Sequence, residues 1–135
     1  MPSRDEALEM PSNAVAHARD AAYVAFLTDD SGDSTVTFRG TISTPQPCSV
    51  LNPFVDAVHD HLSRKGRQLV TVDLTGLEFC NSSGFKSLIR WIDLILQQPE
   101  AAQYRLGFRS NPSRKWQRTS LLALTCFAPS RVEMA

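Results

Sequence analysis

The chain has 135 residues, which is enough for one hydrophobic core and too few for two well-packed domains. Its 14 Lys and Arg residues balance 14 Asp and Glu residues, so it lacks the basic surplus that non-specific binding to nucleic acid requires. With 42% hydrophobic and 21% charged residues, the composition is that of a soluble globular protein rather than a disordered chain.

The sequence shows no targeting or membrane-spanning segment. No stretch reaches the ~20 apolar residues that a membrane span needs, and residues 1–6 lack the apolar core of a secretion signal. Cys48, Cys80 and Cys126 are too widely separated for a C-x-x-C pair or a zinc knuckle. We therefore expect reduced thiols, a cytoplasmic location, no direct membrane insertion, and neither a metal nor another cofactor.

The first 20 residues are polar and rich in alanine, and they predict an N-terminal arm with at best a short helix over about 13–20. Its role stays open between a flexible arm and a dimer-forming helix. Residues 21–135 are expected to form the domain. Two β-type runs, 23–27 and 34–39, flank a turn rich in Asp and Gly, which indicates a β-hairpin whose second strand ends at Gly40.

The rest of the chain alternates helices and strands. Asn52 is a plausible N-cap, with Pro53 in the first helical position, for an amphipathic helix that ends at Lys65-Gly66. A strand over 68–74 and a connection over 75–80 follow. The later segments predict a helix over 85–96, a strand over 104–109, and a last helix that starts at Asn111-Pro112 and carries Trp116. This order favours a single α/β domain in which helices pack on a mixed β-sheet.

The helix over 85–96 has the strongest periodicity in the chain. Its stripe of apolar residues is expected to face the sheet, and consists of Phe85, Leu88, Ile89, Ile92 and Leu96. Trp91 lies off this stripe, so we expect it to be partly exposed and to serve as an apolar anchor for a partner.

The turn before this helix carries the most informative residues, which are Asn81, Ser82, Ser83 and Gly84. Unsatisfied N–H groups and the positive end of the helix dipole favour an anion at this position. A serine hydroxyl here either caps the helix or carries a phosphate, and the residues alone leave both roles open.

Residues 69–85 resemble the signature of STAS domains, named for sulfate transporters and anti-sigma factor antagonists, and the wider resemblance covers about 23–128. It implies a STAS-like mixed sheet in one domain and a phosphate-accepting role for Ser82, with Ser83 as the neighbouring candidate. Asn81 departs from the pattern, because phosphorylated members usually have Asp there. Asn keeps the capping oxygen but removes a negative charge beside Ser82, which puts recognition by a cognate kinase in doubt.

The resemblance implies a signalling module without catalytic activity. Its partner would be an anti-sigma factor or a related serine kinase, bound through Asn81, Ser82, Ser83, Gly84, Lys86 and Trp91. Phosphorylation of Ser82 would switch this binding electrostatically. A constitutive STAS-type subunit of a transporter or scaffold complex is the alternative from another class, favoured by Asn81 and by the short stretch after the last helix. The oligomeric state stays open.

Other groups of residues give weaker functional signals. A basic group near the last helix, Arg105, Arg109, Arg114, Lys115 and Arg118, is either a solvated face or a site for an acidic partner, a phosphorylated ligand or a nucleotide. Trp116 is expected to be half-buried packing.

Signals for catalysis are few. His59 and His61 point about 200° apart on a helix, so they are expected to face solvent rather than share a metal ion. Cys80 is expected to be a small buried hydrophobe rather than a reactive thiol. Since no nucleophile elbow, Walker loop or dinucleotide fingerprint is present, we expect no enzyme activity.

Overall fold

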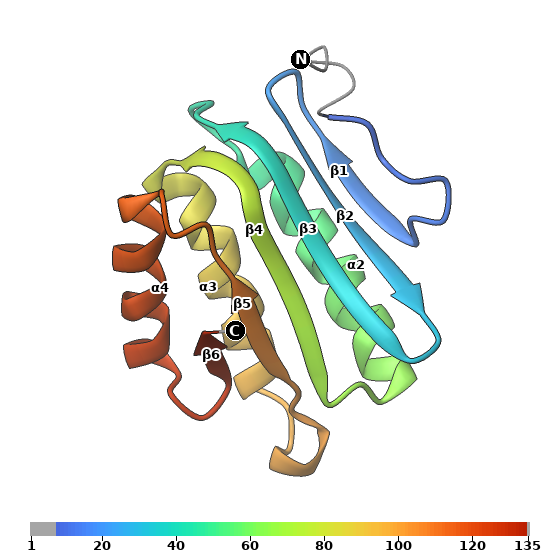
Figure 1. Cartoon of the computed structure of the whole chain (residues 1–135). Helices are drawn as coiled ribbons and strands as arrows, with labels where there is room; N and C mark the ends of the chain where they lie inside the picture. The colour runs from blue at the N-terminus through green and yellow to red at the C-terminus, as the bar shows by residue number, and fades with distance from the viewer. Residues whose placement is uncertain (1–7, 135) are drawn as a thin grey trace.

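The computed structural model describes residues 8–134, which form a mixed β-sheet with helices on one face (Figure 1). The strands are β1 (Ala16–Arg19), β2 (Tyr23–Asp30), β3 (Asp33–Ile42), β4 (Leu69–Cys80), β5 (Arg105–Arg109) and β6 (Val132–Met134). The helices are α2 (Cys48–Lys65), α3 (Ser82–Leu96) and α4 (Lys115–Phe127), with a short 3₁₀ helix at Glu100–Ala102. The single α/β domain with a mixed sheet that we predicted is confirmed.

The strands lie in the order β1-β2-β3-β4-β5-β6. The β1–β2 and β2–β3 pairs are antiparallel, whereas the β3–β4, β4–β5 and β5–β6 pairs are parallel. In Figure 1, α2 and α3 lie behind the sheet and α4 lies along its β5–β6 side. Because β4 and β5 are parallel, α3 and α4 both begin near the same end of the sheet, at the carboxyl ends of these strands, which is where ligands bind in open α/β sheets.

The β2–β3 hairpin agrees with the period-two pattern, and its turn is Ser31-Gly32. Gly40 lies inside β3 with φ +98°, and a Cβ there would collide with the carbonyl oxygen of Ala22. A glycine is therefore required at this crossing of the backbone. The main core lies between the sheet and the helices, and a small second cluster of Leu8, Val24 and Phe26 covers the other face of β2.

The helix expected over about 13–20 is wrong. Residues Ala16–Arg19 form β1, which pairs with β2 from Ala16↔Leu27 to Arg19↔Val24. A short isolated helix is only marginally stable in water, whereas pairing with β2 at the sheet edge gives these residues stable backbone hydrogen bonds. Tertiary context therefore overrides the helical preference of alanine. The last part of the expected N-terminal arm thus contributes a strand to the sheet, and residues 1–7 lie outside the described residues.

Several element ends also differ from the prediction. Helix α2 begins at Cys48 after Pro47, so Asn52 and Pro53 lie within it rather than at its start. Strand β4 continues through the expected connection to Cys80, because register shifts keep it paired with β3. Helix α4 begins at Lys115 rather than Asn111, and β6 was not predicted. These ends depend on pairing with distant segments, which local patterns do not report.

The buried face of α3 is rotated relative to the predicted stripe. Its buried residues are Gly84, Ser87, Leu88, Trp91, Ile92 and Ile95. Phe85 and Ile89 are only half-buried, and Leu96 is exposed. The predicted exposure of Trp91 is wrong, since its side chain is 1% exposed.

Candidate functional site

The turn between β4 and α3 is held by the side chain of Asn81. Its backbone is extended, with φ −72° and ψ 171°, and its Oδ1 accepts a hydrogen bond from the Gly84 N–H at 2.8 Å. Its Nδ2 donates to the carbonyl oxygen of Thr44 at 2.9 Å. This position therefore needs a side chain with both an acceptor and a donor, and the carboxylate of an Asp supplies only the acceptor. The predicted N-cap is confirmed, and the amide has a second role in tying the turn to the segment after β3.

Ser82 and Ser83 differ in accessibility. Ser82 is the first residue of α3 and is exposed, and its hydroxyl has no hydrogen-bond partner among residues 8–134. Ser83 is half-buried, and its carbonyl oxygen accepts a contact from the Cys48 thiol at 3.0 Å. The hydroxyl of Ser82 is thus the more accessible of the two to a modifying enzyme.

Gly84 lets the start of α3 approach the ends of β3 and β4. A Cβ at this position would lie 2.7 Å from Cγ2 of Ile42 and 2.9 Å from Sγ of Cys80. Both distances are shorter than real Cβ contacts, so a larger residue would force these side chains or the start of the helix to shift. Gly84 is buried and therefore shapes the turn rather than its surface.

The electrostatic surroundings of Ser82 favour an anion. The first turn of α3 contains no acidic residue, so nothing on the helix offsets the positive end of its dipole. Lys86 lies four residues after Ser82, on the same face of the helix, and is exposed.

Trp91 takes part in a buried polar chain instead of a surface. Its Nε1–H donates to the hydroxyl of Tyr104 at 2.8 Å, and this hydroxyl lies 2.7 Å from Nδ1 of His59. The tyrosine hydroxyl thus accepts from Trp91 and also bonds to the imidazole, with a direction that depends on the tautomer of His59. The predicted anchor role of Trp91 is therefore wrong for the described structure: its indole joins α3 to β5 and α2.

An aromatic pair that the sequence did not reveal lies next to the turn. Phe79, near the end of β4, is 46% exposed, and its ring centroid lies 6.3 Å from that of Trp116 at the start of α4. The indole N–H of Trp116 donates to the carbonyl of Glu78 at 2.8 Å, and the expected half-burial of Trp116 is confirmed. The sequence signal for Phe79 was hidden because residues 75–80 resemble a loop, which gives no basis for assigning an exposed face.

The predicted basic group is spread over several elements. Arg105 and Arg109 lie on β5, where Arg105 pairs with Glu133, and Nη1 of Arg109 lies 3.9 Å from Oδ2 of Asp73. Arg114 precedes α4 and is half-buried, whereas Lys115 and Arg118 are exposed on its first turns.

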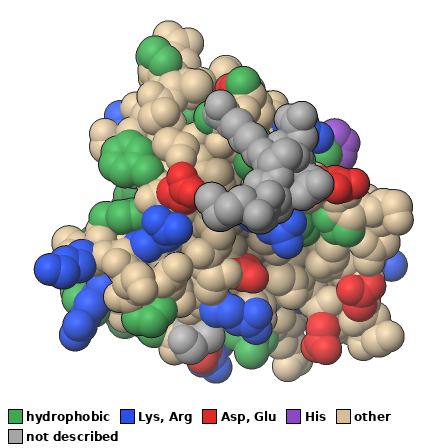
Figure 2. All heavy atoms as spheres, turned by 45° about the horizontal axis from the view of Figure 1, so that its top comes forward, with side chains coloured by type: hydrophobic (Ala, Val, Ile, Leu, Met, Phe, Trp, Pro, Cys, Tyr) green, Lys and Arg blue, Asp and Glu red, His purple; other side chains and the backbone are tan. Residues whose placement is uncertain are grey.

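Only Lys115 and Arg118 of this group line one open hollow, together with Asn111, Pro112 and Met134. Figure 2 shows Lys and Arg side chains gathered on the left, the side on which Figure 1 places α4, among exposed hydrophobic side chains.

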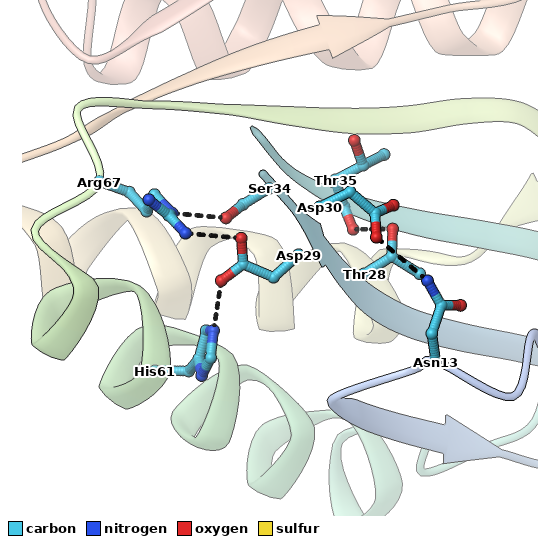
Figure 3. A network of polar contacts seen from close by, with 8 residues as sticks. All are labelled: Asn13, Thr28, Asp29, Asp30, Ser34, Thr35, His61 and Arg67. Atoms are coloured by element: carbon cyan, nitrogen blue, oxygen red, sulfur yellow. Dashed lines mark hydrogen bonds and ion pairs between the residues drawn. The ribbon is translucent and has the colours of Figure 1, made fainter. Parts of the chain in front are cut away.

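The two histidines of α2 do not face solvent as predicted. His59 contacts Tyr104, and Nε2 of His61 donates to Oδ2 of Asp29 at 2.8 Å (Figure 3). Nη2 of Arg67 donates to Oδ1 of the same Asp29 at 2.6 Å. Burial raises the pKa of Asp29, but hydrogen bonds from His61 and Arg67 outweigh it and hold this pKa below its ordinary value of 3.8.

The network around Asp29 joins β2, β3, α2 and the start of β4, at the end of the sheet opposite to Ser82. No cluster of three or more His, Cys, Asp or Glu residues within 8–134 has the arrangement of a metal site.

Cys80 lies half-buried beneath the turn. Burial, with a smaller contribution from Cys48, raises the pKa of its thiol to about 12. The thiol therefore stays protonated at neutral pH and is a poor nucleophile.

Comparisons with known proteins give a fold but no sequence family. The chain matches no protein-family model and no curated protein sequence. Among solved structures, it is similar to an anti-sigma factor antagonist from Mycobacterium paratuberculosis, with a TM-score of 0.55 and 17% sequence identity over 86% of this chain and 89% of that chain. None of the helices in the described part of the chain is long and apolar enough to cross a membrane. The chain therefore has the STAS-like fold of this antagonist, as the motif at residues 69–85 predicted.

Proposed function

We propose that the protein is a signalling module without catalytic activity that binds a partner protein through the turn Asn81–Gly84 and the exposed side of α3. The partner class is an anti-sigma factor or a related serine kinase, and phosphorylation of Ser82 switches the binding. The observation that carries the proposal is the exposed hydroxyl of Ser82, which has no hydrogen-bond partner among residues 8–134 and lies at the positive end of a helix that packs on the sheet. The shared fold with a solved anti-sigma factor antagonist supports the partner class.

A phosphate on Ser82 would change the surface without unfolding the turn. It adds about −1.5 to −2 charges at pH 7, which the helix dipole and Lys86 stabilise on the free protein. The capping bonds of Asn81 involve Gly84 and Thr44, so they remain in place when Ser82 is modified. The switch therefore acts on a docked partner, through repulsion and the cost of desolvating the phosphate.

The aromatic pair Phe79 and Trp116 supplies the apolar part of this surface. Exposed aromatic side chains are frequent anchors of protein interfaces, and this pair lies beside the turn, at the end of β4 and the start of α4. In this proposal it takes the place of Trp91. The partner surface then consists of Phe79, Asn81, Ser82, Lys86 and Trp116.

The test compares Ser82→Ala and Ser82→Asp as baits in a pull-down from native lysate, followed by identification of the retained proteins. We expect Ser82→Ala to retain the partner and Ser82→Asp to lose it. Ser12→Asp is the matched control, because Ser12 is also exposed but precedes β1 on another part of the surface. Equal retention of every partner by Ser82→Ala and Ser82→Asp would refute the switch.

A constitutive subunit of a transporter or scaffold complex is the second candidate. The observation that favours it is Asn81, whose amide oxygen and nitrogen both hold the turn and which lacks the charge of the usual Asp. Intact-mass measurement of the protein captured from its native cells separates the two functions. An unmodified mass together with a constant stoichiometry of co-purified proteins would support the constitutive subunit, whereas the mass of one added phosphate would support the switch.

A further inference from the structure

The outer side of α4 is largely apolar and carries no charge from Thr119 to the end of the helix. The helix turns Gln117, Leu121 and Leu124 into the protein, whereas Leu122 is 52% exposed and Phe127 is 50% exposed. Thr119, Leu122, Ala123, Cys126 and Phe127 are all exposed and recur at helical spacing, and we call them the α4 face. The chain has no charged residue from 119 to 130. A contiguous exposed apolar surface of this kind marks an interaction site more often than a free surface.

The charges at the two ends of α4 are arranged against its dipole. Lys115 and Arg118 lie near the start of α4, where the helix dipole is positive, and the first turn of α4 contains no acidic residue. The last turn, where the dipole is negative, contains no basic residue. Arg131 is the next cation along the chain, and its Nε donates to Oε1 of Gln103. If the α4 helices of two copies lay antiparallel, Lys115 and Arg118 of each copy would lie near the C-terminal carbonyl groups of α4 in the other copy.

The positions of two side chains along α4 also fit a symmetric pair. Lys115 and Cys126 are both exposed, and at about 100° per residue they lie on nearly the same side of the helix, one in its first turn and one in its last. A two-fold axis across the middle of α4 therefore brings Lys115 of one copy to Cys126 of the other.

We propose that the α4 face binds the α4 face of a second copy of this chain, in an antiparallel and two-fold symmetric pair. A helix of 13 residues is ~20 Å long, so one helix pair buries less than the ~800 Å² per partner of standard stable interfaces. The dimer is therefore reversible and depends on protein concentration. This inference is independent of the proposed function, because it uses neither Ser82 nor the turn.

Sedimentation equilibrium of the full chain over a wide concentration range tests the association. We expect the average mass to rise from one copy to two. Leu122→Glu brings two carboxylates into the symmetric interface and is expected to raise the dissociation constant at least about tenfold. Leu69→Glu is the matched control, because Leu69 is 55% exposed at the start of β4, and it should change the constant by less than about twofold. Circular dichroism checks that both variants fold, and Phe127→Glu replaces Leu122→Glu if that variant does not.

Cross-linking tests the antiparallel arrangement. Lys115 of one copy should lie near Cys126 of the other, whereas these positions are ~16 Å apart along one helix. An amine-to-thiol cross-linker whose span is shorter than this distance is applied to a mixture of ¹⁴N- and ¹⁵N-labelled protein. It should link Lys115 of a ¹⁴N copy to Cys126 of a ¹⁵N copy, and Lys115 of a ¹⁵N copy to Cys126 of a ¹⁴N copy. Cys126→Ser is the control and should remove this product.

Three outcomes would overturn the proposal. They are a chain that stays monomeric at every concentration, a dimer that Leu122→Glu leaves unchanged, and cross-links between copies that avoid both Lys115 and Cys126. A monomer that co-sediments with vesicles of phosphatidylcholine and phosphatidylglycerol, and loses this binding in Leu122→Glu, would assign the α4 face to a lipid surface instead.

Discussion

Asn81 shows how one side chain decides the geometry of the turn. Its amide accepts from Gly84 N and donates to Thr44 O, and no other side chain of this size performs both tasks with the same atoms. Asp, the usual residue in the resembling motif, would place a negative oxygen against the carbonyl of Thr44. The departure from the motif thus has a structural reason in this chain.

We expect Asn81→Asp to lower the free energy of unfolding by about 1 kcal/mol. Losing the bond to Thr44 leaves a carbonyl unpaired, at about 1–3 kcal/mol, whereas a carboxylate at the helix start regains about 0.3–1 kcal/mol. Urea denaturation at pH 7 measures the difference, and Asn81→Ser, which keeps a capping oxygen, is the comparison. A more stable Asn81→Asp variant would contradict the role assigned to Thr44.

His59 makes the stability of the protein depend on pH. Burial lowers the pKa of its imidazole below the ordinary 6.5, against the smaller opposing effect of the Asp56 and Asp60 carboxylates. Because the unfolded chain binds this proton more tightly, the contribution of His59 to stability is complete above about pH 6.5 and is lost as the pH falls below it.

Chemical denaturation at a series of pH values between about 8 and 5 tests this dependence. The free energy of unfolding should fall as the medium becomes acidic. In His59→Gln the fall should be smaller, because this variant lacks the imidazole whose pKa burial lowers. An identical slope in both proteins would show that His59 does not contribute.

At the scale of elements, α3 illustrates why an apolar stripe is not the same as a buried face. Its apolar residues form two adjacent stripes, one with Phe85 and Ile89 and the other with Trp91 and Ile95. The second stripe is buried because α2 packs against this helix, and because Tyr104, just before β5, supplies its hydroxyl to the indole N–H. A buried Trp needs such a partner, and here the partner lies 13 residues further along the chain.

We therefore expect different costs for two isoleucines of α3. Ile92, which is 0% exposed, should lose about 2–5 kcal/mol of stability on substitution with Ala. Ile89 is half-buried, so Ile89→Ala should cost less than about 2 kcal/mol. Thermal and urea unfolding of both variants measure the order, and a larger cost at Ile89 would restore the face that the periodicity favoured.

For the whole molecule, Gln117 connects α4 to the centre of the sheet. It is fully buried, and its Nε2 donates to the carbonyls of Leu74 and Leu77 in β4, each at 2.8 Å. Its Oε1 accepts from the N–H of Asn111 at 2.8 Å. One side chain therefore satisfies three backbone groups where β4 leaves its regular pairing, and it fixes the start of α4 beside the turn of α3.

Gln117→Met keeps the volume of this side chain but leaves those three backbone groups unpaired. Because each unpaired buried group costs about 1–3 kcal/mol, we expect a loss of at least about 2 kcal/mol in the free energy of unfolding. Gln97→Met, at an exposed glutamine after α3, is the control and should be nearly neutral. Equal stability of the two variants in urea would show that Gln117 is not a structural connection.

The sequence by itself determined the features that depend on neighbouring residues. The β2–β3 hairpin, the helix over most of 85–96 and the cap at Asn81 follow from local periodicity and from the chemistry of helix starts. These signals, in their order along the chain, were sufficient for the mixed sheet and for the accessible position of Ser82.

Only the tertiary structure decided which surfaces are covered. It paired β1 and β6 at the sheet edges, buried Trp91 against Tyr104, and left Phe79 exposed beside Trp116. The physical reason is that burial and edge pairing depend on contacts between segments far apart in the chain, whose energies local periodicity does not contain.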